Sequence, residues 1–199
     1  MWDQRYSEAG FAYGTEPNDF LRSEYARIPK GGRVLCLAEG EGRNAVFLAK
    51  HGYVVTAVDQ SSVGLAKARR LASDHGVEIS AIVADLADYD LGHDCWDGIV
   101  SISAHVPPGL RKKLHNQVGL ALTVGGCLIL EAYTERQLET EGIGGPPPSS
   151  PELFMSLSEL QSELETLDFT IGRERVRNVS EGKHHQGESA VVQVLACRG

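Results

Sequence analysis

The sequence has little positive charge and no long apolar run. It holds 19 Lys and Arg against 27 Asp and Glu, for a net charge of −8 at pH 7. A chain this acidic is a poor partner for nucleic acid or an anionic membrane, because their phosphates repel it. No apolar run is long enough to cross a bilayer, and the first ten residues lack the apolar core of a signal peptide. We therefore expect a cytoplasmic protein without nucleic-acid or membrane partners.

Cysteine is also scarce. Cys36, Cys95, Cys127 and Cys197 are widely spaced, and none forms a Cys-x-x-Cys pair. In a reducing compartment this pattern predicts four free thiols. Three of them lie in apolar runs, which is typical of buried structural cysteines. The neighbouring His184 and His185 have no third ligand spaced to complete a metal site with them, so we expect no metal.

The 199 residues fit a single domain in which apolar runs alternate with amphipathic helices. This alternation is typical of a parallel sheet covered on both faces. The expected strands are 33–37, 53–59, 79–85, 96–103 and 127–133, with helices at 43–51, at about 62–76 and after Pro107-Pro108. Residues 135–155 read as a flexible loop, followed by a helix at 156–167. Segments 169–179 and 188–197 then predict an antiparallel hairpin. The expected fold class is α/β, a Rossmann-like, doubly wound and mostly parallel sheet.

Glycines and acids follow the first three predicted strands. Gly40 and Gly42 come after the first strand, where they let the backbone turn tightly and approach a ligand. Asp59 ends the second strand, and a carboxylate at this position can bind both hydroxyls of a ribose. Asp85 ends the third strand and can accept a hydrogen bond from an amine such as that of adenine. Because ligands bind beyond the carboxyl ends of parallel strands, these residues predict a nucleoside site.

The glycine loop also satisfies the loose Gly-x-Gly-x-x-Ala pattern of dinucleotide-binding proteins. Glu39 and Glu41 flank the loop, however, and their negative charge suits a cation better than a diphosphate. A nicotinamide-dependent reductase would also need a donor such as Tyr-x-x-x-Lys after the fourth or fifth strand, and none appears. This reading is therefore kept as the weaker alternative.

The segment VLCLAEGEGRNAVFLAKHGYVVTAVDQSSVGLAKAR (34–69) resembles the glycine loop and second strand of class I methyltransferases that use S-adenosylmethionine. The resemblance is greatest to the small tellurite-resistance and thiopurine methyltransferases, and it covers nearly the whole chain. It extends through WDQRY, YGTEPNDFL, ADL and LILEAYTERQL. Cys36 stands where the family has an acid, and Ala38 replaces the first glycine of the loop. A module that binds the cofactor without catalysis is the alternative that the missing acid supports.

The resemblance implies a cofactor site made of the loop, the next two strand ends and the N-terminal segment. The loop and Asn44 should wrap the homocysteine part, Asp59 the ribose, and Asp85 with Leu86 the adenine. The cofactor-binding residues expected on this basis are Tyr13, Gly14, Ala38, Glu39, Gly40, Gly42, Asn44, Asp59, Gln60, Ser61, Asp85, Leu86 and Ser101.

The first 25 residues contain six of the 13 aromatic side chains. The bent Tyr13-Gly14 segment predicts a lid, because aromatic faces attract a sulfonium cation and a closed site excludes water. There is no separate cap domain, so we expect a small-molecule substrate and a monomer or homodimer. A soft nucleophile such as a thiol, tellurite or selenite needs little or no general base. His105, Tyr133 and His185 are the candidate catalytic residues on the substrate side.

Overall fold

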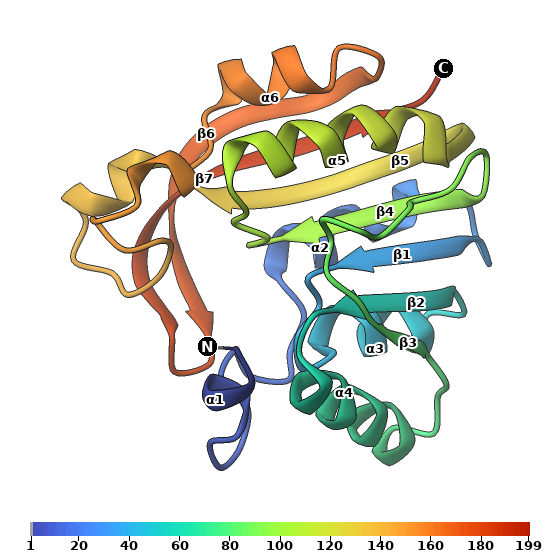
Figure 1. Cartoon of the computed structure of the whole chain (residues 1–199), viewed down its shortest axis with the longest axis horizontal. Helices are drawn as coiled ribbons and strands as arrows, with labels where there is room; N and C mark the ends of the chain where they lie inside the picture. The colour runs from blue at the N-terminus through green and yellow to red at the C-terminus, as the bar shows by residue number, and fades with distance from the viewer. Residues whose placement is uncertain (1) are drawn as a thin grey trace.

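The computed structural model describes residues 2–199 and contains one seven-stranded sheet with helices on both faces (Figure 1). The strand order is β3-β2-β1-β4-β5-β7-β6. The first five strands are parallel: β1 (Arg33–Leu37), β2 (Val54–Asp59), β3 (Ser80–Val83), β4 (Trp96–Ile102) and β5 (Leu122–Tyr133). The last two strands, β6 (Asp168–Glu181) and β7 (His185–Cys197), form an antiparallel hairpin. This confirms the expected α/β class and the antiparallel end of the sheet.

Successive side chains of the buried strands point alternately into two separate hydrophobic cores. Leu35 and Leu37 face the core covered by α5 (Pro108–Ala121) and α6 (Leu157–Glu163). Val34 and Cys36 face the other core, which is covered by α2 (Asp19–Glu24), α3 (Arg43–Lys50) and α4 (Ser62–Asp74). Because both faces are buried, the strands read as continuous apolar runs in the sequence. The short α1 (Trp2–Tyr6) packs against α4.

Helix starts follow the local sequence signals. Ser61 caps α4 by accepting a hydrogen bond from the N–H of Gly64, and Ser156 forms a capping box with Glu159 at the start of α6. Gly42 precedes α3 with a φ of 91°, a conformation that glycine adopts without strain. These starts place the first turns of α3 and α4 directly beyond β1 and β2.

Several element boundaries differ from those expected. β5 begins at Leu122 rather than 127, and its pairing with β4 shifts register between Trp96 and Gly98. Helix α6 ends at Glu163, four residues earlier than expected. The hairpin strands extend into the segment expected to be a loop, so that His185 begins β7. The segment 135–155, which was expected to be a flexible loop, contains two short 3₁₀ helices, η2 (Glu135–Glu139) and η3 (Pro151–Leu153).

The expectation of four free thiols is wrong for one pair, because a disulfide joins Cys127 and Cys197. The antiparallel register of β5 and β7 places these two residues directly opposite each other, with their Cα atoms 4.1 Å apart. Cross-strand neighbours this close are within reach of a disulfide, whereas their separation of 70 residues hides the pairing in the sequence. Cys36 and Cys95 are free. Within residues 2–199, no helix combines the length and the apolar character needed to span a bilayer.

Candidate active site

A cavity of about 790 Å³ lies beyond the carboxyl ends of the parallel strands. Figure 1 shows this end of the sheet, where the N-terminal segment and the β6–β7 hairpin come together. The cavity touches the glycine loop, the residues after β2, β3 and β4, the N-terminal segment and the hairpin tip. Of the expected cofactor-binding residues, those that line it are Tyr13, Gly14, Ala38, Glu39, Asn44, Asp59, Gln60, Asp85 and Leu86.

Glu39 occupies the N-terminus of α3. Its Oε1 accepts hydrogen bonds from the main-chain N–H groups of Asn44 (2.9 Å) and Ala45 (2.8 Å). Burial raises the pKa of this carboxyl to about 7, although the two N–H donors oppose that shift. Cys36, which stands where the resembling family has an acid, is fully buried beneath the loop. The acidic group of this loop therefore lies on Glu39, three residues further along the chain.

Gly40 and Gly42 do not line the cavity, and packing explains why neither can carry a side chain. A Cβ on Gly40 would lie 2.5 Å from the hydroxyl oxygen of Tyr6, and a Cβ on Gly42 would lie 2.6 Å from the Cβ of Ala68. Both contacts are shorter than real Cβ atoms make. The glycines let the loop lie under α1 and against α4.

Asp59 is held in place by the glycine loop and by the start of α4. Its Oδ2 accepts from the N–H of Gly40 (2.9 Å), and its Oδ1 accepts from the N–H of Ser61 (2.7 Å). Burial raises its pKa, while these two hydrogen bonds oppose the rise. Each oxygen retains a lone pair for a ligand, because a carboxylate accepts about four hydrogen bonds. Ser61 itself does not line the cavity; its hydroxyl caps α4 and bonds to Asp3.

The third strand end is more open than the second. Asp85 is exposed, and its Oδ1 accepts from the N–H of Ala87. Leu86 is buried and gives this end of the cavity an apolar surface. Ser101 is buried within β4 and does not reach the cavity, whereas Ile102 and Ser103 line it. The expected residue after β4 is therefore displaced by one or two positions.

The N-terminal segment is fastened to the hairpin tip. The N–H of Lys183 donates to the carbonyl of Ala12 at 2.9 Å, and Gly14 and Gly182 pack so closely that a Cβ on either would meet the other. Tyr13 accepts a hydrogen bond from Arg5, and its ring lies 4.5 Å from that of His185 between centroids. This segment and the hairpin form one continuous wall of the cavity.

The three candidate catalytic residues have different surroundings. Both ring nitrogens of His105 bind main chain: Nδ1 to the carbonyl of Leu153 (2.9 Å), and Nε2 to the N–H of Tyr133 (3.2 Å). Burial lowers the pKa of His105 to about 4. The buried Tyr133 does not line the cavity, and burial raises its hydroxyl pKa. His185 lines the cavity, and its Nδ1 has no hydrogen-bond partner, since Glu181 Oε2 is 3.8 Å away.

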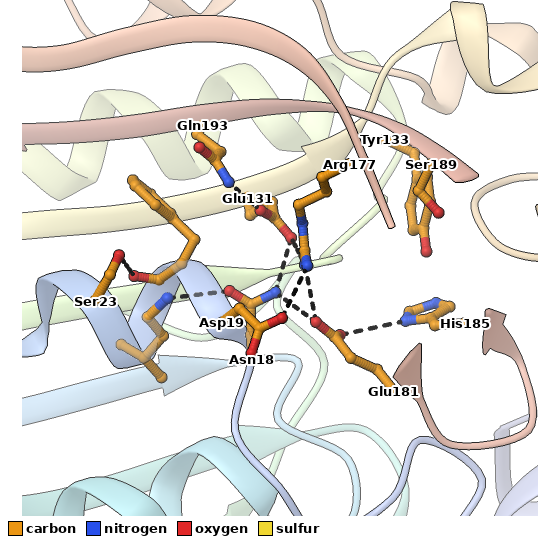
Figure 2. A network of polar contacts seen from close by, with 12 residues as sticks. Asn18, Asp19, Ser23, Glu131, Tyr133, Arg177, Glu181, His185, Ser189 and Gln193 are labelled. Atoms are coloured by element: carbon orange, nitrogen blue, oxygen red, sulfur yellow. Dashed lines mark hydrogen bonds and ion pairs between the residues drawn. The ribbon is translucent and has the colours of Figure 1, made fainter. Parts of the chain in front are cut away.

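A buried polar network supports the cavity wall behind His185 (Figure 2). Arg177 Nη2 lies 2.6 Å from Glu131 Oε1 and 2.9 Å from Glu181 Oε1. The Asn18 side-chain amide donates to the same two oxygens, and Gln193 donates to Glu131 Oε2. Arg43 Nη2 completes the network by pairing with Glu181 Oε2 at 2.7 Å. The two arginines balance the two buried glutamates, and Arg177 Nη1 also lies 3.2 Å from Oδ2 of the exposed Asp19.

Sequence reasoning missed this network and several residues of the cavity wall, among them Trp2 and Arg5. One signal was present: Glu131 is a lone acid in the apolar run LILEAY, and a charge in a buried strand requires a partner. The partner residues lie on other elements and carry no local signal. Among residues 2–199, no three His, Cys, Asp or Glu side chains gather as metal ligands would.

The residues that line the cavity fit a nucleoside joined to a cationic group. Asp59 and Asp85 place carboxylate oxygens beyond β2 and β3, where they suit hydroxyl and amine donors, and Leu86 supplies an apolar contact. Glu39 adds an acidic group at the end of β1, and the ring of Tyr13 faces the same cavity. A diphosphate would meet acids here in place of the positive charge that it needs.

Comparison with known proteins agrees with this chemistry. Residues 34–126 match the family model described as a methyltransferase domain. No curated protein matches the chain. Among solved structures, TehB from Haemophilus influenzae is 18% identical with a TM-score of 0.73, covering 100% of this chain and 66% of that one.

Two further solved structures share the fold. A methyltransferase dependent on S-adenosylmethionine from Methanosarcina mazei is 18% identical with a TM-score of 0.65, covering 92% of this chain and 98% of that one. The second structure was solved in work on the conversion of a disulfide bond into a thioacetal group during echinomycin biosynthesis. It is 21% identical with a TM-score of 0.72, covering 99% of this chain and 90% of that one. Residues 34–126 therefore match a methyltransferase domain, the chain shares the class I methyltransferase fold, and S-adenosylmethionine is the cofactor that this match and fold imply.

Proposed function

We propose that this chain methylates a small molecule through a soft nucleophile such as a thiol, selenite or tellurite. The observation that carries the proposal is the single cavity wall that joins Glu39, Asp59 and Asp85 beyond three adjacent parallel strands. In support, the structurally similar protein of echinomycin biosynthesis is described as acting on a disulfide bond, which is sulfur chemistry.

Each residue of the acidic wall has a proposed part in holding the cofactor. Asp59 accepts from the ribose hydroxyls, since each of its oxygens keeps a free lone pair. Asp85 and Leu86 hold the adenine, and Glu39 and the Ala38 main chain hold the amino-acid end. Bound S-adenosylmethionine supplies a methyl group whose carbon bonds to the acceptor's lone pair as its bond to the sulfonium sulfur breaks, leaving S-adenosylhomocysteine.

The chain acts mainly by aligning the two reactants and excluding water from the cavity, and less by transferring protons. Val106, Leu110, Pro146 and Leu153 form an apolar wall, and Tyr13 closes the cavity from the N-terminal side. Excluding water and aligning the reactants supply most of the acceleration in a displacement of this kind. His105 has no free ring nitrogen, so among the candidate histidines we assign acceptor contact to His185.

Binding of S-adenosylhomocysteine, measured by calorimetry, tests the proposal. We expect micromolar affinity that Asp59→Ala abolishes and that Asp74→Ala, an exposed acid on α4, leaves unchanged. Transfer of labelled methyl groups to a panel of thiols, selenite and tellurite then tests catalysis. Cofactor binding without turnover on any acceptor would favour a non-catalytic cofactor-binding module. Tight NADH binding without S-adenosylhomocysteine binding would overturn the proposal.

A further inference from the structure

Three buried nitrogen atoms at one end of the cavity lack any hydrogen-bond partner. They are Nη1 of Arg43, Nε2 of His184 and Nδ1 of His185. All three residues line the cavity, and Arg43 and His185 are 7% and 8% exposed. Leaving a buried polar atom without a partner is unfavourable, so such atoms are rare unless a ligand satisfies them.

The three donors come from two elements that meet at Glu181. Arg43 Nη2 lies 2.7 Å from Glu181 Oε2, and His185 Nδ1 lies 3.8 Å from the same oxygen. His184 and His185 both pack on Tyr13, with ring centroids 5.8 and 4.5 Å away. Figure 2 shows His185 beside Glu181 at the edge of the buried network. Glu181 is already satisfied by Arg43, Arg177 and Asn18, so the free nitrogens remain available to a ligand.

The charge at this end favours an anion. Arg43 and Arg177 balance the buried Glu131 and Glu181, and the third acid of the network, Asp19, has a side chain that is 64% exposed. Arg5 also lines the cavity and has no acidic partner within the described part of the chain; it bonds instead to the Tyr13 hydroxyl at 2.8 Å and lies over the ring of Trp2. One positive charge and three unpaired donors thus face a common space.

The position of His184 and His185, which Arg43 reaches through Glu181, points to the methyl acceptor. Asp59 and Asp85 end β2 and β3, whereas the hairpin tip belongs to β7, which lies four strands from β2 in the sheet. At about 4.8 Å per strand this separation is roughly 19 Å at the level of the sheet. A nucleoside bound at β2 and β3 leaves the hairpin side of the cavity for the second reactant.

On the basis of the proposed function, we propose that the methyl acceptor carries a carboxylate, which binds Arg43 Nη1 together with the free ring nitrogens of His184 and His185. The nucleophilic atom is then a separate atom of the acceptor, held toward the cofactor by the anchored carboxylate. The cofactor's own carboxylate and an inorganic oxyanion present the same chemistry to these donors, so the test must separate the three.

Binding to the protein saturated with S-adenosylhomocysteine provides the test, with three thiols of equal length that differ in charge. They are 3-mercaptopropionate, its neutral amide 3-mercaptopropionamide and the cationic cysteamine. Calorimetry should give 3-mercaptopropionate an affinity about tenfold or more above that of the amide, as a charge-assisted hydrogen bond predicts, with cysteamine weakest. Equal affinities for the three thiols would overturn the proposal. It would also fail if none of them bound at 10 mM, a concentration roughly a hundred times the usual dissociation constant of a small ligand.

Two variants test whether the preference for 3-mercaptopropionate depends on the unpaired nitrogen atoms of Arg43 and His184. Arg43→Gln removes Nη1, and His184→Phe keeps a ring against Tyr13 but removes Nε2. Both should lose the preference for 3-mercaptopropionate while still binding S-adenosylhomocysteine, which shows that they are folded. A preference retained in both variants would contradict the assignment.

Two further probes separate the other sources of an anion. If Arg43→Gln weakens S-adenosylhomocysteine but not 5′-methylthioadenosine, which lacks the amino-acid end, the donors hold the cofactor's carboxylate and the proposal fails. Selenite that binds more tightly than 3-mercaptopropionate would assign the donors to an inorganic oxyanion, again against the proposal. A protein that binds no S-adenosylhomocysteine at all would instead refute the methyltransferase function itself.

Discussion

The main-chain N–H of Tyr133 donates a hydrogen bond to Nε2 of His105 over 3.2 Å. The other ring nitrogen of His105 binds the carbonyl of Leu153, so this histidine bridges β5 and the last residue of η3. A ring with both nitrogens engaged in this way acts as a structural bridge. Its surroundings keep it neutral at physiological pH.

We expect acid to destabilise the protein through His105. Because its pKa is about 4 in the folded state against an ordinary value of 6.5, unfolding releases an imidazole that takes up a proton. This contribution to stability is present above pH 6.5 and is lost as the pH falls toward 4, to a limit of about 3 kcal/mol. Urea unfolding of the native protein and of His105→Gln across this range should show the native protein losing more stability. Parallel curves for the two proteins would refute this role.

Glu39 should make cofactor binding depend on pH around neutrality. Burial raises its pKa to about 7, so the carboxyl ionises between pH 6 and 8 and only then offers a negative charge to a cation. The affinity for S-adenosylhomocysteine, whose amino group is cationic, should rise by about tenfold over this range. Glu39→Gln keeps the oxygen that caps α3 and should show a flat profile. A rise that persists in the variant would assign the effect to another group.

Loss of Arg177 should be strongly destabilising. The substitution Arg177→Met leaves Glu131 and Glu181 buried side by side with fewer partners, which costs about 3–5 kcal/mol. Arg175 projects from the same strand and is exposed, so Arg175→Met should change stability by less than about 0.5 kcal/mol. Denaturant unfolding of both variants provides the measurement, and similar losses in the two would contradict the network's importance.

The disulfide predicts a specific thiol count. Titration of the unreduced, denatured protein should find two free thiols, those of Cys36 and Cys95, and four after reduction. Reduction should lower the free energy of unfolding by about 2–4 kcal/mol, because a link across 70 residues restricts the unfolded chain. Cys36→Ser retains the link and serves as the control for thiol chemistry elsewhere. Four thiols without reductant would show that the pair is open under those conditions.

The sequence predicts the sheet well because its signals there are local. Apolar runs such as RVLCL mark buried strands. Ser61 and Ser156 mark helix starts through hydrogen bonds to residues close by in the chain, and Pro108 marks one through its fixed φ. The boundary of β5 was missed because its first residues pair with β4 only after a register shift. Such a shift depends on the neighbouring strand and leaves no trace in the run itself.

The site was predictable in part for the same reason. Asp59 and Asp85 follow their strands directly, so topology alone brings them to one edge. The roles of Arg43, Glu181 and His184 depend on contacts between α3 and a hairpin that lies well over a hundred residues further along the chain. The pairing of Cys127 with Cys197 likewise depends on register across two distant strands. Only the folded chain supplies those contacts.

The place of β7 between β5 and β6 sets an order of assembly. β6 has no neighbour in the sheet until β7 is inserted, although β6 precedes it along the chain. A growing polypeptide can therefore complete its parallel half early, while the hairpin wall with His184 and His185 awaits the final strand. The acceptor site that we propose is complete only when synthesis has passed that strand.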